Sequence, residues 1–275
     1  MDASGTPGDV HAAARRCLET RDPSLKAALA QALQHEIGHG RLPLCASQAD
    51  GEPALRVGRP ERPELVAPRA LAQRGLGSEA GRASFLHAIA HIEFNAINLA
   101  CDAAWRFRDL PLQFYRDWID VAADEARHFT LLRARLNELA HDYGDFPAHD
   151  GLWEMAEKTA HSCLARMALV PRVLEARGLD VTPAMIGKLR HLGDARSAES
   201  LELILCEEVA HVAAGSHWFR WCCEREGVDP RITFDALLRE HARSVLRPPF
   251  NLPARRAAGF DPDELDALQA LAGVA

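Results

Sequence analysis

Apolar residues recur every three or four positions along most of the chain, and no segment alternates with a period of two. This pattern predicts helices and argues against strands. We expect a helical segment at 8–38, broken near Asp22 and Pro23, and four long helices at about 81–108, 111–143, 152–177 and 197–226. Shorter helices are expected from Thr182, at about 233–246, and behind the capping-box residues Asp261, Pro262 and Glu264.

Residues 40–74 interrupt the helical pattern because they are rich in Pro and Arg. Proline lacks a backbone donor and blocks a continuing helix, so we expect an extended arm laid over a surface. No Gly/Ser linker separates the segments. The sequence therefore predicts one all-α domain over 1–275, with a four-helix bundle at about 81–227, an N-terminal helix and arm at 8–80, and a C-terminal extension at 228–275.

Composition narrows the class of protein. The chain is 48% hydrophobic and 26% charged, which supplies a buried core and excludes a disordered chain. A net charge of −7 excludes a uniformly basic, nucleic-acid-binding surface. No apolar run is long enough to span a membrane, and no secretory signal is visible. The seven cysteines lack a CxxC pair, which favours reduced thiols and a cytoplasmic location.

The string Glu-x-x-His places two metal-binding side chains on one helix face, and it occurs four times. Position on the helix separates these occurrences, at Glu36/His39, Glu125/His128, Glu138/His141 and Glu208/His211. Glu125 and Glu208 lie on the apolar seams of the second and fourth long helices, and Glu93 lies on that of the first. Glu138 falls beside its seam.

Three carboxylates on seams that face one core would repel one another. Because burying an unpaired carboxylate costs several kcal/mol, a pair of cations is expected to neutralise them, with His128 and His211 as further ligands. Glu93 and Glu125 also lie at similar heights in their hairpin, roughly 24 and 21 Å from the turn.

A fourth ligand should come from the third long helix, where the candidates are Glu157, His161 and Glu175. Glu157 and His161 suit the height argument, since Gly178 is expected to end the helix soon after Glu175. The spacing favours Glu175, because Glu175 to Glu208 is 33 residues and Glu93 to Glu125 is 32, which is typical of a duplicated helical hairpin. We take Glu175 as the ligand.

We expect the remaining candidate residues to have structural or surface roles rather than to bind metal or substrate. The segment from His35 to His39 fits a zinc-protease string, but Gly38 and Gly40 end its helix and no third ligand follows. His87 and His91 are expected to be core or ligand-supporting residues. The arginines of the arm, together with Arg247, Arg255 and Arg256, are expected on the solvated surface.

The ligand pattern and the surrounding segments, His91-Ile-Glu-Phe-Asn, Asp124-Glu-Ala-Arg-His, Leu174-Glu-Ala-Arg-Gly and Glu207-Glu-Val-Ala-His, carry a family resemblance. Together they resemble the ferritin-like di-iron-carboxylate superfamily and, over about 55–260, a bacterial family within it called domain of unknown function 455. More distantly, the chain resembles the di-iron tRNA hydroxylases, whose Glu-Ala-Arg segment supports Glu175. The resemblance implies a ferritin-like bundle holding two iron ions, with a manganese–iron pair as the alternative.

These observations predict an oxidoreductase or hydroxylase that uses O2 or peroxide and acts on a small molecule. Small seam residues, Ala90, Ala122 and Gly215, would leave room for O2 or substrate. The alternatives are a non-catalytic metal-handling protein and a tRNA-modifying hydroxylase, which the acidic net charge disfavours. No Rossmann or flavin motif is present, so electrons would come from a separate donor protein. A homodimer is compatible with the sequence.

Overall fold

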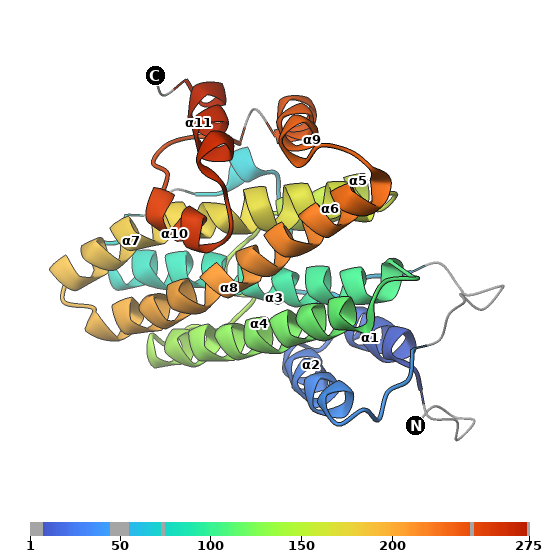
Figure 1. The fold of residues 1–275 in the computed structure, drawn as a ribbon. Helices are drawn as coiled ribbons and strands as arrows, with labels where there is room; N and C mark the ends of the chain where they lie inside the picture. The colour runs from blue at the N-terminus through green and yellow to red at the C-terminus, as the bar shows by residue number, and fades with distance from the viewer. Residues whose placement is uncertain (1–7, 45–54, 73–74, 243–244, 274–275) are drawn as a thin grey trace. The chain divides into compact units, whose positions relative to one another are not determined.

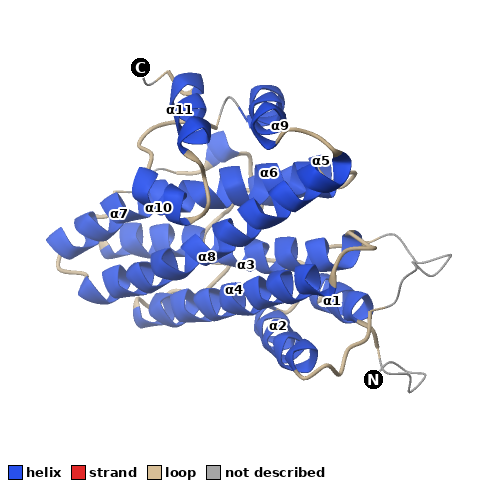
Figure 2. Ribbon diagram, viewed as in Figure 1, coloured by secondary structure: helices blue, strands red, loops and turns tan. Residues whose placement is uncertain are grey.

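The computed structural model describes residues 8–44, 55–72, 75–242 and 245–273. Within these residues the regular elements are helices, and the β-type pairing is a single isolated bridge between Leu65 and Ala148 (Figure 2). The predicted all-α class is therefore confirmed for the described part of the chain. The chain divides into two compact units, residues 1–153 and 154–275, which we call the first unit and the second unit.

In the first unit, two short helices precede a long helical hairpin (Figure 1). The short helices are α1 (Val10–Glu19) and α2 (Pro23–Gly38), each capped by an aspartate, and the break between them is the one predicted at Asp22 and Pro23. The hairpin consists of α3 (Glu79–Arg106) and α4 (Leu112–Glu138), which pack along each other.

The ends of the hairpin helices follow from local chemistry. The Ser78 hydroxyl accepts a hydrogen bond from the Gly81 N–H, which caps α3. Helix α4 ends at Glu138, five residues before the predicted end at 143, because Ala140 takes a left-handed conformation with a φ of 57°. The His141 N–H then closes the end on the Leu136 carbonyl at 3.0 Å.

The described part of the Pro/Arg-rich arm is mostly extended, as predicted, apart from the short turn η1 (Pro68–Ala70). The Val66 N–H donates to the Ala148 carbonyl at 2.8 Å, and the Ala148 N–H donates to the Glu64 carbonyl at 3.0 Å. These bonds hold the arm against the segment that follows α4.

The second unit corrects the prediction for the third long helix. Helix α5 (Gly151–Lys158), which spans the unit boundary, ends early, and a new helix α6 (Cys163–Leu169) starts with Ser162 as its cap. It continues through the π-helical turn η2 (Val170–Glu175) into α7 (Ala176–His191). Gly178 is not a stop, and the separate helix expected from Thr182 is part of α7.

Helix α8 (Ala195–Glu226) pairs with this composite helix and ends at Gly227, whose φ of 69° suits glycine, as predicted. The C-terminal extension forms four further elements. They are α9 (Pro230–Leu237), the π-helical turn η3 (Leu238–Ala242), α10 (Leu252–Ala257) and α11 (Pro262–Leu271). The capping box predicted at Asp261 and Glu264 is present. No helix among the described residues is long and apolar enough to cross a membrane.

Candidate metal centre

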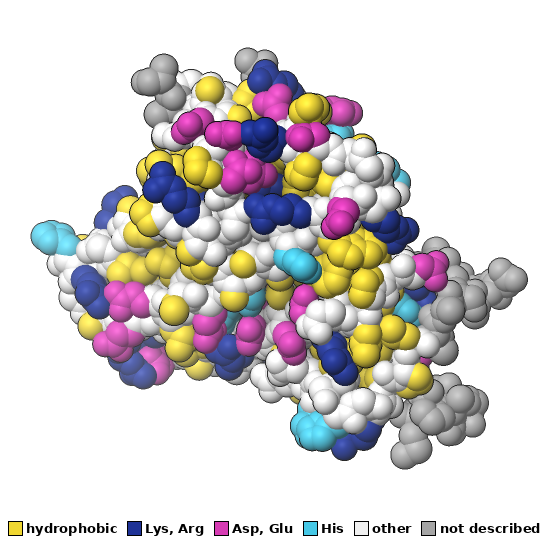
Figure 3. Space-filling view, viewed as in Figure 1, with side chains coloured by type: hydrophobic (Ala, Val, Ile, Leu, Met, Phe, Trp, Pro, Cys, Tyr) yellow, Lys and Arg dark blue, Asp and Glu magenta, His cyan; other side chains and the backbone are white. Residues whose placement is uncertain are grey.

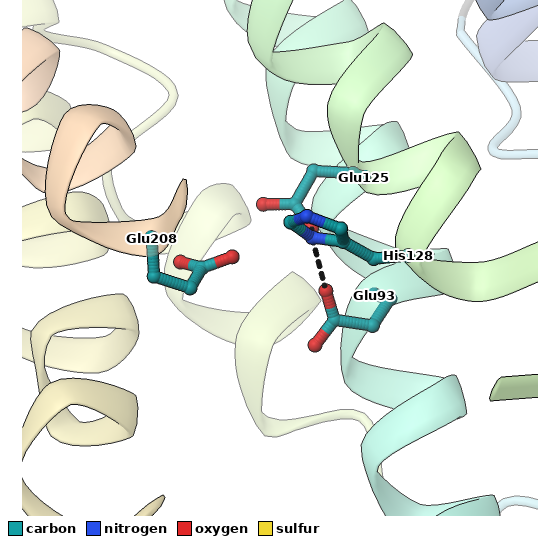
Figure 4. A group of neighbouring side chains, drawn as sticks. All are labelled: Glu93, Glu125, His128 and Glu208. Carbon is teal, nitrogen blue, oxygen red and sulfur yellow. Dashed lines mark hydrogen bonds and ion pairs between the residues drawn. The ribbon is translucent and has the colours of Figure 1, made fainter. Parts of the chain in front are cut away.

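The first unit brings three of the predicted ligands together. Glu93 projects from α3 toward Glu125 and His128 of α4 (Figure 4). His128 Nδ1 lies 3.2 Å from Glu93 Oε2 and 3.5 Å from Glu125 Oε2. One ligand atom from each of the three residues lies within 4.8 Å of the others. This buried group could hold a metal ion.

Helix geometry explains why these side chains meet. Glu93 lies 13 residues before Arg106, the last residue of α3, and Glu125 lies 13 residues after Leu112, the first residue of α4. At 1.5 Å per residue, both stand about 20 Å from the turn. The seam prediction also places them correctly, since seam neighbours such as Ile97 and Phe129 are buried beside them.

Burial makes the charges of this group costly. Glu93, Glu125 and His128 are 4%, 1% and 0% exposed, respectively. Burial by itself would lower the pKa of His128, but its hydrogen bonds to Glu125 and Glu93 outweigh burial and raise that pKa to about 11. Without a metal, this raised pKa favours the protonated imidazole, which lies between the Glu93 and Glu125 carboxyl groups. A metal ion that binds here must displace that proton.

The second unit repeats the motif. Glu208 and His211 lie in the middle of α8, are 9% and 2% exposed, and His211 Nδ1 is 3.2 Å from Glu208 Oε1. Glu208 is also drawn in Figure 4. Glu175 ends the π-helical turn η2 and is 9% exposed. Because the helix runs on to His191, Glu175 stands near the middle of the composite helix, which removes the height argument against it.

The alternative ligand candidates, and the glutamates of the other two Glu-x-x-His strings, are partly or fully exposed to solvent. Glu157 is exposed at the end of α5, and His161 is exposed in the link before α6. Glu138 forms a surface ion pair with Arg135 at 2.7 Å. In the zinc-protease string, α2 ends at Gly38 as predicted, and Glu36 pairs with Arg41 at 2.8 Å.

Two expectations for residues outside the predicted ligand set are wrong. Gly215 does not leave room for O2 or substrate, because a Cβ built there would lie 2.3 Å from Pro171. Arg255 is not a surface residue, since it is 2% exposed and donates to Asp180 at 2.7 and 3.0 Å.

Sequence reasoning identified His87 and His91 as core residues but missed that they belong to a second buried polar stripe, which lies on another face of α3. Its members recur at helical spacing and are all buried, namely His87, His91, Asn95, Asn98 and Asp102. The interval of four, four, three and four residues was visible in the sequence, but polar residues alone do not show which face of a fully buried helix they occupy.

Comparison with known proteins gives the family. The family described as "Protein of unknown function (DUF455)" matches residues 19–266, a longer stretch than the resemblance at 55–260. The chain is also 47% identical, over 214 residues, to an uncharacterized protein of Haemophilus influenzae (strain ATCC 51907 / DSM 11121 / KW20 / Rd), with 75% of this chain and 74% of that protein covered. No solved structure matches. The chain therefore belongs to the DUF455 family of proteins of unknown function.

Proposed function

We propose that this protein is a ferritin-like dinuclear metal protein, with Glu93, Glu125, His128, Glu175, Glu208 and His211 as its ligands. The observation that carries the proposal is the repetition of one arrangement in both units. Each unit has a Glu-x-x-His in mid-helix. The imidazole Nδ1 lies 3.5 Å from the carboxylate of its own pair in the first unit and 3.2 Å in the second. Each also carries one more buried glutamate on the preceding helix of its hairpin, Glu93 or Glu175.

The donor atoms fit iron. Carboxylate oxygens and imidazole nitrogens suit Fe²⁺ and Mn²⁺, whereas thiolates would suit zinc or copper. A Glu from each of two helices plus a Glu-x-x-His from each of two others is the ligand set of ferritin-like di-iron bundles. We therefore propose two iron ions, with a manganese–iron pair as the alternative.

We further propose that the centre serves an oxidoreductase that uses O2 or peroxide on a small molecule. The six ligand residues would hold the two iron ions, which would supply the electrons that reduction of O2 requires. The chain contributes ligands buried in an apolar seam, where Ile97, Phe129 and Leu132 exclude water. A nucleic-acid substrate is disfavoured because the net charge is −7 and acidic and basic side chains are interspersed on the face drawn in Figure 3.

Metal analysis after anaerobic loading with ferrous iron tests the proposal. Wild-type protein should hold two iron ions per chain and, after exposure to air, show the absorption of a diferric centre. Glu125→Ala and Glu208→Ala should each lower the iron content to one ion or less and abolish that absorption, because each removes a ligand from one Glu-x-x-His pair.

Glu138→Ala is the matched control. Glu138 begins another Glu-x-x-His on the same helix as Glu125, but it lies on the surface and pairs with Arg135. It should keep two iron ions. If the Glu125→Ala variant held as much iron as the wild type, the proposed metal centre would be contradicted. Iron binding without consumption of O2 or peroxide in the presence of a reductant would contradict the oxidoreductase and leave the metal-handling function.

A further inference from the structure

A cavity of about 350 Å³ lies in the first unit, between the arm and α3. Its size falls in the range of sites that take small organic molecules, roughly 300–1,000 Å³. The arm forms one side with Pro60, Pro63 and Leu65, and α3 and Tyr143 form the other. Prolines restrict the arm before any ligand arrives, which lowers the entropy lost on binding.

Helix α3 presents His91, Phe94 and Asn95 to the cavity. These three share one helix face, and His91 and Asn95 each lie two residues, or about 200° around the helix, from Glu93. The cavity is therefore separate from the ligand seam, and the inference below is independent of the proposed function. The rings of Phe94 and Tyr143 have centroids 5.3 Å apart and form an aromatic wall.

The polar groups of this wall are fixed. His91 is held through Nδ1 by the Tyr143 hydroxyl at 2.9 Å, and its Nε2 is 3.2 Å from the His149 carbonyl. Asn95 is 2% exposed, and its Nδ2 lies 2.9 Å from His91 Nε2 and donates to the His91 carbonyl at 3.1 Å. Its Oδ1 accepts no hydrogen bond from any residue that the structure describes. That oxygen is an acceptor available to a ligand.

The charges at the cavity are unbalanced. Arg59 Nη2 lies 2.7 Å from both carboxylate oxygens of Asp150, so its charge is compensated. Glu61 and Glu64 are exposed at the rim, and neither forms an ion pair with another residue in the described ranges. Arg62, the neighbouring cation, does not line the cavity. The lining thus carries two uncompensated negative charges.

We propose that this cavity binds a small organic cation with an apolar or aromatic body. The body would lie against Phe94 and Tyr143, whose rings offer apolar surface for stacking. The ammonium group would lie toward Glu61 and Glu64 and donate a hydrogen bond to Asn95 Oδ1. An anion of the same size would meet these carboxylates and be repelled.

Three probes of similar shape and different charge test the inference. Benzylammonium, benzyl alcohol and benzoate are titrated calorimetrically into the metal-free full-length chain at low ionic strength. Benzylammonium should bind at least about tenfold more tightly than benzyl alcohol, and benzoate should bind more weakly still. Equal binding of the three probes, tighter binding of benzoate, or no heat with benzylammonium would overturn the proposal.

Variants locate the site. Glu61→Gln combined with Glu64→Gln should weaken benzylammonium binding about tenfold and leave benzyl alcohol unchanged, since each rim charge contributes modestly. Glu199→Gln, on the exposed face of α8, is the matched control and should change neither. Leu65→Trp, at a side chain that is 38% exposed, should fill the cavity and abolish binding of both probes. Unchanged benzylammonium binding in the double variant would place it elsewhere and contradict the inference.

Discussion

His87 illustrates how a single buried side chain sets the pH dependence of stability. It is fully buried in α3, and its Nε2 accepts a hydrogen bond from the Gly144 N–H at 2.9 Å. Its Nδ1 has no partner among the described residues. Burial lowers the pKa of His87 to about 4, from an ordinary value of 6.5. The folded protein therefore favours the neutral imidazole.

The sign of the effect follows from that shift. The stability that His87 contributes is fully present above its ordinary pKa of 6.5 and is lost as the pH falls toward its folded-state pKa of about 4. The loss should be about 3 kcal/mol for this residue. His87→Gln retains an acceptor for Gly144 and cannot titrate, so its free energy of unfolding should fall less between pH 7 and 4. Urea unfolding at several pH values measures this; parallel curves for the variant and the wild type would contradict it.

Among the candidate residues, the seam argument found Glu93, Glu125 and Glu208 because a carboxylate within an apolar stripe stands out in the sequence. It could not place Asn95 at a cavity. The arm that forms the other wall comes from residues 59–65, and its pairing with Ala148 depends on backbone bonds that leave no side-chain pattern. Residue type therefore predicted the buried charge but not the cavity.

At the scale of elements, the composite helix shows why the third helix was predicted wrongly. Pro183 lies inside α7 and cannot donate to the Leu179 carbonyl one turn earlier. Asn251 replaces that donor, because its Nδ2 donates to the Leu179 carbonyl at 3.1 Å. The compensating residue is 72 residues away from Leu179, so no local pattern could reveal it.

The packing of the C-terminal elements was similarly beyond prediction. Arg172 is fully buried, with its guanidinium 4.1–4.7 Å from the ring centroids of Phe219, Phe234 and Phe260 and an ion pair to Glu264 at 2.7 Å. These contacts attach α9 and α11 to η2 and α8. The individual helices were predictable from caps and periodicity, whereas their packing around Arg172 joins residues far apart in the sequence.

The close contact between the π-helical turn η2 and α8 requires a glycine at position 215. Pro171 packs against Gly215, where a Cβ would lie 2.3 Å from the proline ring. Gly215→Ala should therefore destabilise the protein by about 1–3 kcal/mol, since the rigid ring cannot move aside. Combining it with Pro171→Ala should restore part of the loss. Chemical denaturation measures both.

Gly187→Ala provides the control for helix propensity. Gly187 is exposed within α7, and a Cβ there would meet nothing within 4 Å. This substitution should stabilise the protein by about 0.5–1 kcal/mol, because alanine is the better helix former. If Gly215→Ala were also stabilising, the close packing between η2 and α8 would be refuted.

At the scale of the whole molecule, the proposed centre would draw ligands from both compact units, so metal binding should couple their stabilities. A ligand that binds only the folded state stabilises it by about 2.7 kcal/mol at one hundred times its Kd. Loading with ferrous iron should then slow amide exchange about a hundredfold in both α4 and α8, measured on peptides from 112–138 and 195–226.

Glu208→Ala separates coupled units from independent ones. It alters only α8 in the second unit, yet it should remove most of the iron-induced protection of α4 in the first unit, because a shared centre loses ligands for both. Glu138→Ala, a surface change on α4 itself, should leave the protection of both helices intact. If α4 in Glu208→Ala kept its full protection, then Glu93, Glu125 and His128 would bind metal on their own, and each unit would carry a separate mononuclear site.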